Sequence, residues 1–544
     1  MCVRSFTGFL QDAFCRADGF RAVKTATLPA PPSIWSRRPI IWIRLAYLAA
    51  LNSLFSAVYR SVRSRYGLWR FSATHYGTRL EALAGLHAYL MCAWARKRVP
   101  AYVDFLAENG RAYRVLQLDS FPETSKDAYV RRYGFSERCW DGRHPIAGTL
   151  VDESAGSSGT PYNWLRSRKE LHDVHLDTAN WVRWTYPTER LFALNAFSMG
   201  AWATGTNMAI ALSKVCMVKS TGPDIEKIVD TIESFGDGYD YLLCAYPPFL
   251  KHVVDALDRN GFDWSRTRVY GLVGGEAMTE AMRDHLERRL VKVRSGYGAS
   301  DIQIGIGGET DLSVHVRKLL VARADVREAL LGPDESRVPM VFQYNPLESY
   351  IEINARGESV ITVNNASVLS PRLRYNVGDE ARIMTRPELV SRLAQVGVAG
   401  PMPPGWRLPL LFLFGRSDST VSYMGANIYP LDVEYGLYRD ATLAASIEGF
   451  CLELDDSSVL DSRPVVHVQL RETARIDDRA AAAERLRAGL VEHLAASNRD
   501  FAESLREDPA AADIRVVLHD HGAGPFAGTR AAIKNVYVLE REDN

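Results

Sequence analysis

From residue 168 onward, hydrophobic residues recur along the chain with two different periods. Where they recur every three or four residues they predict amphipathic helices, over residues 168–185, 224–233, 247–259 and 279–290. Between these helices lie short apolar runs that predict buried strands, at residues 191–195, 241–245, 267–272 and 291–294. Helices and buried strands in this alternation predict an α/β fold with a parallel sheet.

From residue 340 the pattern of hydrophobic positions changes. Short apolar runs follow one another with few helical stretches between them. Strands are expected at residues 341–344, 349–353, 358–364, 373–375 and 380–383. They predict a β-rich subdomain. Beyond it, a strand, a long helix and a second strand predict a small α+β unit, at residues 465–470, 477–497 and 514–519. We therefore expect an N-terminal extension over residues 1–70, a large ligand-binding domain over 71–414 and a small mobile domain over 415–544.

Residues 40–59 within the extension are mostly apolar, but Arg44, Asn52, Ser53 and Ser56 interrupt them. A membrane-spanning helix needs about 20 apolar residues with few charges. The stretch also lies too far from Met1 for an ordinary signal peptide. Two interpretations remain open, a helix that is buried or faces a partner and a helix that lies on a membrane surface.

Composition narrows the function classes. The 544 residues include 65 Lys and Arg and 65 Asp and Glu, so no net field draws the protein to nucleic acid. Hydrophobic residues make up 47% of the chain, which is ordinary for a globular protein. The seven cysteines form no Cys-x-x-Cys pair, so neither a disulfide framework nor a cysteine zinc site is indicated. A reducing, cytoplasmic setting fits this usage.

One stretch of small residues predicts an anion site. Strands expected at residues 146–152 and 162–165 flank a loop of glycines and hydroxyl side chains. Consecutive backbone N–H groups and hydroxyls in such a loop suit a phosphate. The residues concerned are Ser154, Gly156, Ser157, Ser158, Gly159 and Thr160. The Gly-Lys-Ser/Thr of the nucleoside-triphosphatase loop is absent, and a flexible Ser/Gly hairpin is the alternative.

Further motifs stand near the ends of predicted strands, where open α/β sheets bind ligands. They are Gly-Gly-Glu at 274–276, Gly-Tyr-Gly-Ala-Ser-Asp at 296–301, Arg-Tyr-Asn-Val-Gly-Asp at 374–379, and Gly-Arg-Ser-Asp at 415–418. Tyr297 between two glycines can lie flat against a base. The Asp301 carboxylate suits Mg²⁺. Asp379 can accept hydrogen bonds from ribose hydroxyls, although an Asx-turn is the plain alternative.

A glycine- and aromatic-rich segment between two predicted elements can line an apolar pocket without much backbone bulk. It contributes Phe197, Met199 and Trp202. The alternative is that Phe197 and Trp202 are ordinary core residues.

Together, the loop of small residues and the four motifs resemble the signature segments of the adenylate-forming enzymes, and most closely the phenylacetate–coenzyme A ligase-like branch. The resemblance spans roughly residues 95–435. It implies that an organic carboxylate reacts with ATP·Mg²⁺ to give acyl-AMP and pyrophosphate. The small domain then rotates about Asp418, and a nucleophile displaces AMP. Coenzyme A is the family's most common acceptor, with an amine or hydroxyl as the alternative.

The resemblance also implies residue roles. Adenine would be held by Gly274, Gly275, Glu276, Tyr297 and Gly298. Ser300 and Asp301 would lie near the phosphates and Mg²⁺, with Asp301 where the family usually has Glu. Asp379 and Arg416 would contact the ribose, and the segment containing Phe197 would border the acyl pocket.

Two lysines of the family pattern are missing. Thr160 replaces one in the phosphate loop, and Thr529 replaces the C-terminal lysine that contacts the acyl carboxylate and α-phosphate. Lys534 or Arg530 is expected to supply that charge, with Lys534 preferred for its flexible stem. These departures keep open a second hypothesis, a nucleotide-binding protein that has lost catalysis. The carboxylic acid itself cannot be read from the sequence.

Overall fold

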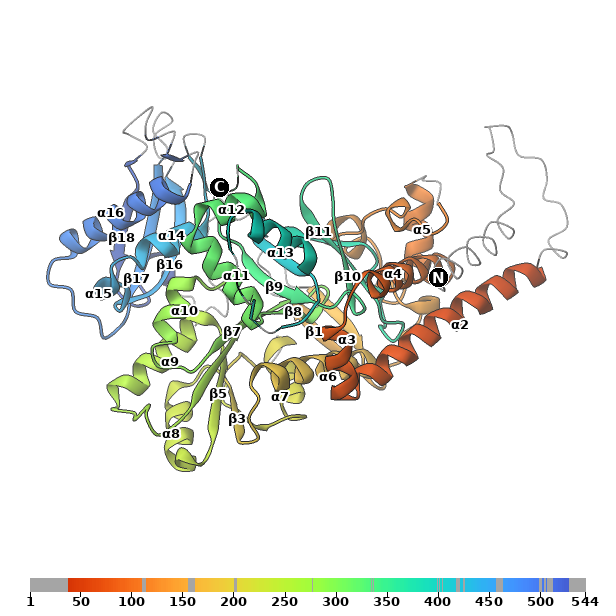
Figure 1. Cartoon of the computed structure of the whole chain (residues 1–544), viewed down its shortest axis with the longest axis horizontal. Helices are drawn as coiled ribbons and strands as arrows, with labels where there is room; N and C mark the ends of the chain where they lie inside the picture. Colours follow the sequence, from red (N-terminus) through yellow and green to blue (C-terminus); the bar gives the residue numbers. More distant parts are fainter. Residues whose placement is uncertain are drawn as a thin grey trace.

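The computed structural model describes residues 38–527, apart from 110–113, 155–161, 200–202, 276, 334, 336, 399, 401, 404, 417–420, 424–425, 456–462, 499–500, 503–504 and 506–511. For a few residues, among them Ser154 and Arg416, only the backbone is described. In this part of the chain an 11-stranded sheet runs through the middle of the molecule (Figure 1). The predicted α/β class is therefore confirmed.

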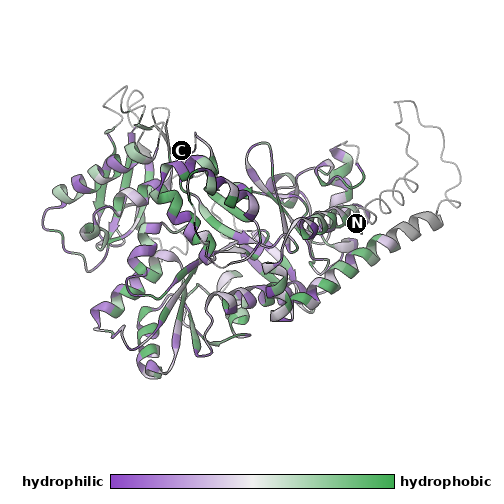
Figure 2. Cartoon of the chain, viewed as in Figure 1, coloured by the Kyte–Doolittle hydropathy of each residue, from purple (hydrophilic) through white to green (hydrophobic). Residues whose placement is uncertain are grey.

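The parallel half of the sheet lies at one end. Its strands, from the edge inward, are β4 (Met217–Ser220), β3 (Leu191–Asn195), β5 (Asp240–Ala245), β6 (Val269–Gly274) and β7 (Val293–Ala299). Alternate residues of β5 point to opposite faces, as a strand requires. Tyr241 and Leu243 pack with the helices α8 (Ile225–Phe235), α9 (Pro247–Arg259) and α10 (Glu280–Leu286). Leu242 and Cys244 pack with α3 (Tyr66–Thr74), α6 (Arg168–Thr185) and α7 (Ala203–Leu212). Such helices alternate green and purple along their length in Figure 2, as amphipathic helices do.

The antiparallel half continues the same sheet. Beyond β7 come β8 (Gln303–Gly308), β9 (Met340–Tyr344), β13 (Leu410–Arg416), β12 (Tyr375–Met384), β11 (Glu358–Val363) and β10 (Ser349–Ile353). The short strands expected after residue 340 are present, but they do not form a separate sheet, because β8 and β9 join them to the parallel strands. The two strands expected at residues 373–375 and 380–383 are one strand, β12. Helices α11 (Asp311–Ala322), α12 (Ala324–Leu331) and α13 (Arg386–Gln395) pack against this half.

The hairpin that carries the predicted anion loop stands apart from the large sheet. Its strands are β1 (Thr149–Ser154) and β2 (Tyr162–Ser167), which pair antiparallel. The first begins and ends later than the stretch 146–152 expected from the sequence. Helix α6 follows β2 directly over residues 168–185, as predicted, because Ser167 and Glu170 form a capping box.

The C-terminal part has its own core. Strands β16 (Ile447–Asp455), β17 (Arg463–Leu470) and β18 (Arg515–His519) form a three-stranded sheet. Helices α14 (Pro430–Leu437) and α16 (Arg479–Ser497) cover it through Val433, Leu437, Leu486 and Leu490. The short strands β14 (Val421–Tyr423) and β15 (Ala426–Ile428) precede this core, and α15 (Ala441–Ala444) follows α14. The expected α+β pattern is present. Tyr435 touches the large part, where its hydroxyl accepts a hydrogen bond from the Glu280 N–H at 3.2 Å.

The apolar N-terminal stretch lies in helix α2 (Arg38–Arg63), which slants away from the body (Figure 1). One face packs on α4 (Thr78–Arg98) and α6, with Leu48, Asn52 and Tyr59 buried. The opposite face exposes Leu54 and Val58. None of the helices in the described ranges is both long enough and apolar enough to cross a membrane. Helix α5 (Pro100–Glu108) follows α4.

Candidate nucleotide and acyl site

Two of the predicted motifs meet at the end of neighbouring parallel strands. Gly274 at the end of β6 is in register with Gly296 in β7. The next residue, Gly275, has a φ of +87°, and a Cβ there would lie 2.4 Å from the ring of Tyr246. Only glycine fits this turn, because the Tyr246 ring occupies the space that a side chain would take. Glu276, the third residue of the motif, lies outside the described residues.

The Tyr297 and Asp379 motifs are cross-linked by two hydrogen bonds. The Tyr297 hydroxyl donates to Asp379 Oδ2 at 2.6 Å, and the Tyr375 hydroxyl donates to Asp301 Oδ2 at 2.8 Å. Each motif therefore supplies the tyrosine that orients the other motif's aspartate. Burial and then Asp379 raise the pKa of Tyr297 well above its usual range, so its hydroxyl stays a donor at neutral pH.

The Tyr297 ring has a defined position. One side stacks on Phe342, with the ring centres 5.6 Å apart and an angle of 25° between the planes. The residue also lines the main cavity. The motif lies inside β7 and not after it, because β7 runs to Ala299.

The pairing of β12 with β13 brings together the backbones of Asp379 and Arg416, the two residues predicted to contact the ribose. Asp379 in β12 is in direct register with Arg416 in β13. The side chain of Arg416 and the whole of Asp418, the expected hinge residue, lie outside the described residues. The Asp379 side chain therefore contacts Tyr297, while its backbone lies opposite that of Arg416.

Two buried arginines support Ser300 and Asp301 from behind. The Arg166 guanidinium donates to the Ser300 carbonyl and, at 2.7 Å, to the Ile302 carbonyl. Arg372 Nε donates to the Asp301 carbonyl at 3.1 Å. Burial and then the charge of Arg166 lower the pKa of Arg372 to about 9. Neither arginine belonged to a motif, and a lone arginine in a sequence gives no signal of such a contact.

The predicted anion loop begins beside these arginines. Arg166 lies in β2, and its Nε is 3.2 Å from Asp152 Oδ2 in β1. Arg372 lies over the Trp164 ring at 5.2 Å. Ser154 ends β1 and is in register with Tyr162, the first residue of β2. The loop residues Gly156, Ser157, Ser158, Gly159 and Thr160 lie outside the described residues, so their role stays a prediction.

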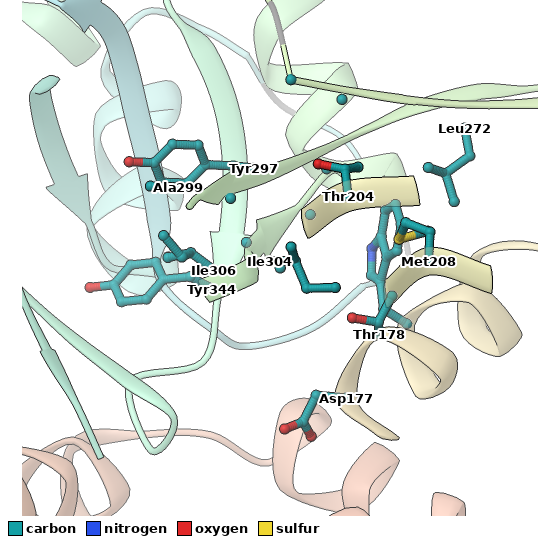
Figure 3. A pocket seen from close by; sticks show the side chains of 18 of the residues that line it. Asp177, Thr178, Thr204, Met208, Leu272, Tyr297, Ala299, Ile304, Ile306 and Tyr344 are labelled. Atoms are coloured by element: carbon teal, nitrogen blue, oxygen red, sulfur yellow. The ribbon is translucent and has the colours of Figure 1, made fainter. Parts of the chain in front are cut away.

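A cavity of about 170 Å³ opens beside the Gly275 turn (Figure 3). Six residues predicted from the sequence line it, namely Phe197, Gly274, Gly275, Tyr297, Gly298 and Ser300. Other lining residues come from the flanking helices and loops and from β8, among them Trp69, Trp181, Met208, Tyr246, Ile304 and Trp406. Met199 is not among the lining residues, and 42% of its surface is exposed. Trp202 lies outside the described residues.

The sequence did not single out Trp181. The fold places this residue in the cavity wall, where its ring packs closely against Gly308. A Cβ on Gly308 of β8 would lie 2.5 Å from the Trp181 ring. The ring therefore occupies space that a side chain on β8 would take. Its Nε1 donates to the Glu309 carbonyl at 3.2 Å.

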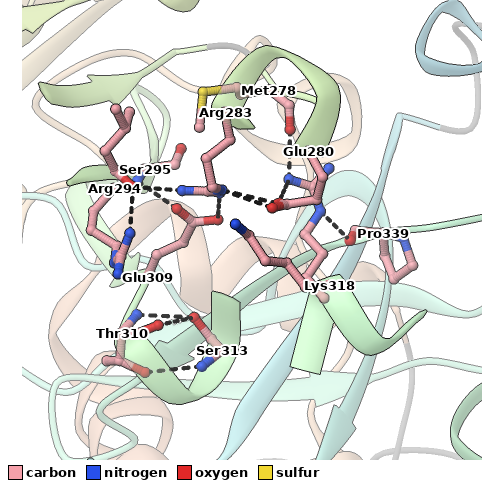
Figure 4. Close-up of polar contacts among 12 residues, drawn as sticks. Met278, Glu280, Arg283, Arg294, Ser295, Glu309, Thr310, Ser313, Lys318 and Pro339 are labelled. Atoms are coloured by element: carbon pink, nitrogen blue, oxygen red, sulfur yellow. Dashed lines mark hydrogen bonds and ion pairs between the residues drawn. The ribbon is translucent and has the colours of Figure 1, made fainter. Parts of the chain in front are cut away.

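A buried ion network joins α10, β7 and the loop after β6 (Figure 4). Arg283 of α10 has no exposed surface and lies 2.6 Å from Glu309 Oε1 and 2.9 Å from Glu280 Oε2. Glu309 Oε2 accepts from the Ser295 N–H at 2.7 Å, one residue before Gly296. Arg317 of α11 donates to the Met278 carbonyl in the loop after Gly275. The network thus holds in place the segment that follows Gly275 and the β7 segment that contains Gly296.

The C-terminal cations expected from the sequence, Arg530 and Lys534, lie outside the described residues. In the ranges that are described, no group of three or more His, Cys, Asp or Glu side chains could hold a metal. Asp301 offers one carboxylate. That suits Mg²⁺, because this ion usually takes one or two carboxylates together with water and substrate phosphates.

Comparison with solved structures identifies the fold. A crystal structure of 2-hydroxyisobutyryl-CoA ligase in the postadenylation state with 2-HIB-AMP matches with a TM-score of 0.61 at 14% identity, over 86% of this chain and 91% of that chain. The complex of that ligase with R3-HIB-AMP gives 0.60 at 14% identity, over 84% and 89% of the two chains. No family model and no curated protein matches this sequence. The chain has the fold of the adenylate-forming ligases.

Proposed function

We propose that the protein activates an organic carboxylic acid with ATP, giving acyl-AMP and pyrophosphate, and then transfers the acyl group. The observation that carries this proposal is the crossed pair of hydrogen bonds, Tyr297 to Asp379 and Tyr375 to Asp301, beside the cavity. This pair orients the two carboxylates to which the resemblance assigns the ribose and the metal-bound phosphates. The fold shared with a CoA ligase supports the same assignment.

In the first step, a carboxylate oxygen of the acid forms a bond to the α-phosphorus of ATP. The bond from that phosphorus to the β-phosphate bridging oxygen breaks, and pyrophosphate leaves with the electron pair. The turn at Gly275 would admit the adenine, Asp379 would accept hydrogen bonds from the ribose, and Ser300 would face the phosphates. Mg²⁺ held through Asp301 would neutralise phosphate charge.

In the second step, an acceptor attacks the acyl carbonyl and AMP leaves. We propose coenzyme A, whose thiol loses its proton as the thioester forms, and assign the chain to the phenylacetate–coenzyme A ligase-like branch. An amine or a hydroxyl acceptor is the alternative. The change between steps would involve rotation of the C-terminal domain, residues 415–544, about Asp418.

The test is pyrophosphate release with ATP and Mg²⁺ across a panel of carboxylic acids. Acid-dependent release, with acyl-AMP detected by mass spectrometry, is the expected result. Thr160 and Thr529 favour a second candidate, a nucleotide-binding protein without catalysis. That candidate predicts ATP binding by calorimetry and no release with any acid. Absence of ATP binding as well would overturn both.

A further inference from the structure

Helices α2 and α3 leave large apolar side chains exposed. On α2 these are Tyr47, Leu54 and Val58, and more than half of the surface of the last two is exposed. Their spacing of seven and four residues puts them on one face, opposite the buried Asn52 and Tyr59. Helix α2 slants away from the body (Figure 1), so this face can meet a flat surface.

Helix α3 has an exposed apolar face of its own. Leu68 and Phe71 are 43% and 59% exposed and stand three residues apart, while the other side of the helix buries Trp69. At about 100° per residue, Arg65 and Arg70 lie to either side of this apolar face. Such an arrangement is typical of a helix that lies in the headgroup layer of a membrane.

The charge of this region has one sign. Residues 19–80 contain ten Lys and Arg and no Asp or Glu, whereas the whole chain has 65 of each kind. The carboxylates that pair with arginines of α2 are Asp173 and Asp177, which belong to α6 and whose side chains are only 2% and 11% exposed. Neither α2 nor α3 itself carries an acidic side chain that an anionic surface would repel.

Three exposed arginines stand on or beside α3, namely Arg65, Arg70 and Arg183. None of them forms an ion pair with another described residue. The Arg70 guanidinium lies 5.4 Å from the Trp184 ring centre, and the Arg183 guanidinium lies 4.4 Å from the Tyr66 ring centre. These ring contacts hold two of the charges close to α3 without neutralising them, so they stay available for anionic headgroups.

We propose that the outer faces of α2 and α3 bind the surface of a bilayer that contains anionic lipids. The apolar side chains enter the headgroup region, and the three arginines contact headgroup phosphates. A second copy of the chain fits this face poorly, because a two-fold contact would set the arginines of one copy against those of the other. The apolar residues are Tyr47, Leu54, Val58, Leu68 and Phe71, and none of the eight residues lines the cavity. The inference is therefore independent of the proposed adenylation.

The test is sedimentation of the full chain with sucrose-loaded vesicles of phosphatidylcholine alone or with about 30% phosphatidylglycerol. We expect binding to the anionic vesicles to be at least about tenfold stronger and to weaken as salt is added. Leu54→Ser combined with Val58→Ser removes apolar surface, and Arg65→Glu combined with Arg70→Glu reverses charge. Each pair should weaken binding by at least about tenfold.

The matched control for the apolar pair is Val321→Ser combined with Val390→Ser. These valines lie on α11 and α13 and are 42% and 46% exposed, so the same chemical change is made on other surfaces. This double variant should bind vesicles as the wild type does. Arg65→Lys combined with Arg70→Lys keeps the charge and should also keep binding. Every variant should retain the wild-type ATP affinity and urea midpoint, which checks folding.

Four outcomes would overturn the proposal. Folded protein that sediments with neither kind of vesicle has no membrane face, and equal binding to both kinds rules out recognition of anionic lipid. Unchanged binding by either double variant of α2 or α3 places the contact elsewhere, residues 1–37 included. The last outcome comes from sedimentation velocity. A concentration-dependent dimer that Leu54→Ser with Val58→Ser abolishes, without vesicle binding, would make this face an interface between copies of the chain.

Discussion

Asp379 gains its orientation from a residue 82 positions earlier in the chain. The Tyr297 hydroxyl donates to it, and strand pairing places it opposite Arg416. A sequence motif can suggest that such an aspartate binds ribose. It cannot show which neutral donor holds the carboxylate in place, because that partner is chosen by the register between distant strands.

At the proposed ribose contact, Asp379→Ala should weaken ATP binding by about 1.5–3 kcal/mol, the range for losing hydrogen bonds to a charged group. The measurement is calorimetric titration of ATP. Asp379→Asn is the matched control for folding, because an amide oxygen can still accept from Tyr297 while the charge is lost. Wild-type ATP affinity in a folded Asp379→Ala protein would contradict the ribose assignment.

At the scale of elements, the sequence predicted helix α6 to the residue because its periodicity and its capping box agree. It failed for β8, whose Gln-Ile-Gly-Ile-Gly-Gly sequence is too rich in glycine to indicate a strand. Those glycines are required by packing, since Gly308 makes room for Trp181. Missing β8 made the antiparallel strands look like a separate subdomain, although β8 and β9 join both halves into one sheet.

The ion network beneath β7 should be a main determinant of stability. Among the described residues, Glu309→Gln would leave the fully buried Arg283 with Glu280 as its only carboxylate ion-pair partner. Breaking one side of a buried pair costs about 3–5 kcal/mol in free energy of unfolding. Urea unfolding of the wild type and the variant measures this loss in free energy of unfolding.

The control for that variant is an exposed ion pair between α10 and α11. Asp284 of α10 and Lys318 of α11 form an ion pair of 2.9 Å, but the two side chains are 66% and 42% exposed. Asp284→Asn should therefore cost less than about 1 kcal/mol. Equal effects of the two variants would mean that the buried network contributes no more than a surface pair.

Helix α4 should make the protein sensitive to acid through His87. Burial first, and then Arg63, lower the pKa of this histidine to about 4. In the unfolded chain it binds a proton below about pH 6.5. The unfolded state therefore takes up more protons between these values, and the free energy of unfolding falls as pH is lowered through that window.

His87→Phe tests this dependence, because Phe55 already stacks on the imidazole with ring centres 5.0 Å apart. Between pH 7.5 and pH 5 the wild type should lose about 2 kcal/mol more than the variant in urea unfolding. Groups that both proteins contain contribute equally to the two pH profiles, so their effect cancels in the difference. Asp432 is one of them, and its raised pKa of about 7 acts in the opposite direction. Parallel pH profiles would show that His87 titrates normally in the folded state.

At the scale of the whole molecule, the C-terminal part meets the large sheet through polar contacts and through Tyr438, which packs with the helices that cover the parallel strands. Tyr435 accepts from the Glu280 N–H, and Arg471 pairs with Asp255 of α9. Glu280 is itself held by Arg283 and Arg317, so the contact reaches the network under the nucleotide site. Polar contacts of this kind can be exchanged for others when a domain turns, which suits the proposed rotation between two half-reactions.

The same domain must supply a cation if adenylation proceeds as proposed. Negative charge builds up where the acid's carboxylate approaches the α-phosphate, and one positioned donor in such a site contributes about 2.7–4 kcal/mol, or 10²–10³ in rate. Thr529 cannot provide that charge, which leaves Arg530 and Lys534 as the nearest candidates in the sequence.

We therefore expect Lys534→Ala to slow acyl-AMP formation by at least about tenfold, while transfer from preformed acyl-AMP is spared, since the charge is needed only in the first half-reaction. The measurement is single-turnover pyrophosphate release with an acid that the panel identifies as a substrate, and Arg530→Ala is the paired variant. An unchanged rate for Lys534→Ala with a collapse for Arg530→Ala would move the role to Arg530. If both variants keep the wild-type rate, the first half-reaction does not depend on either cation, and charge at the α-phosphate must be met from the large domain instead. Arg372 would then be the first residue to test, because its buried guanidinium lies behind Asp301 and its charge is disfavoured by burial and by Arg166.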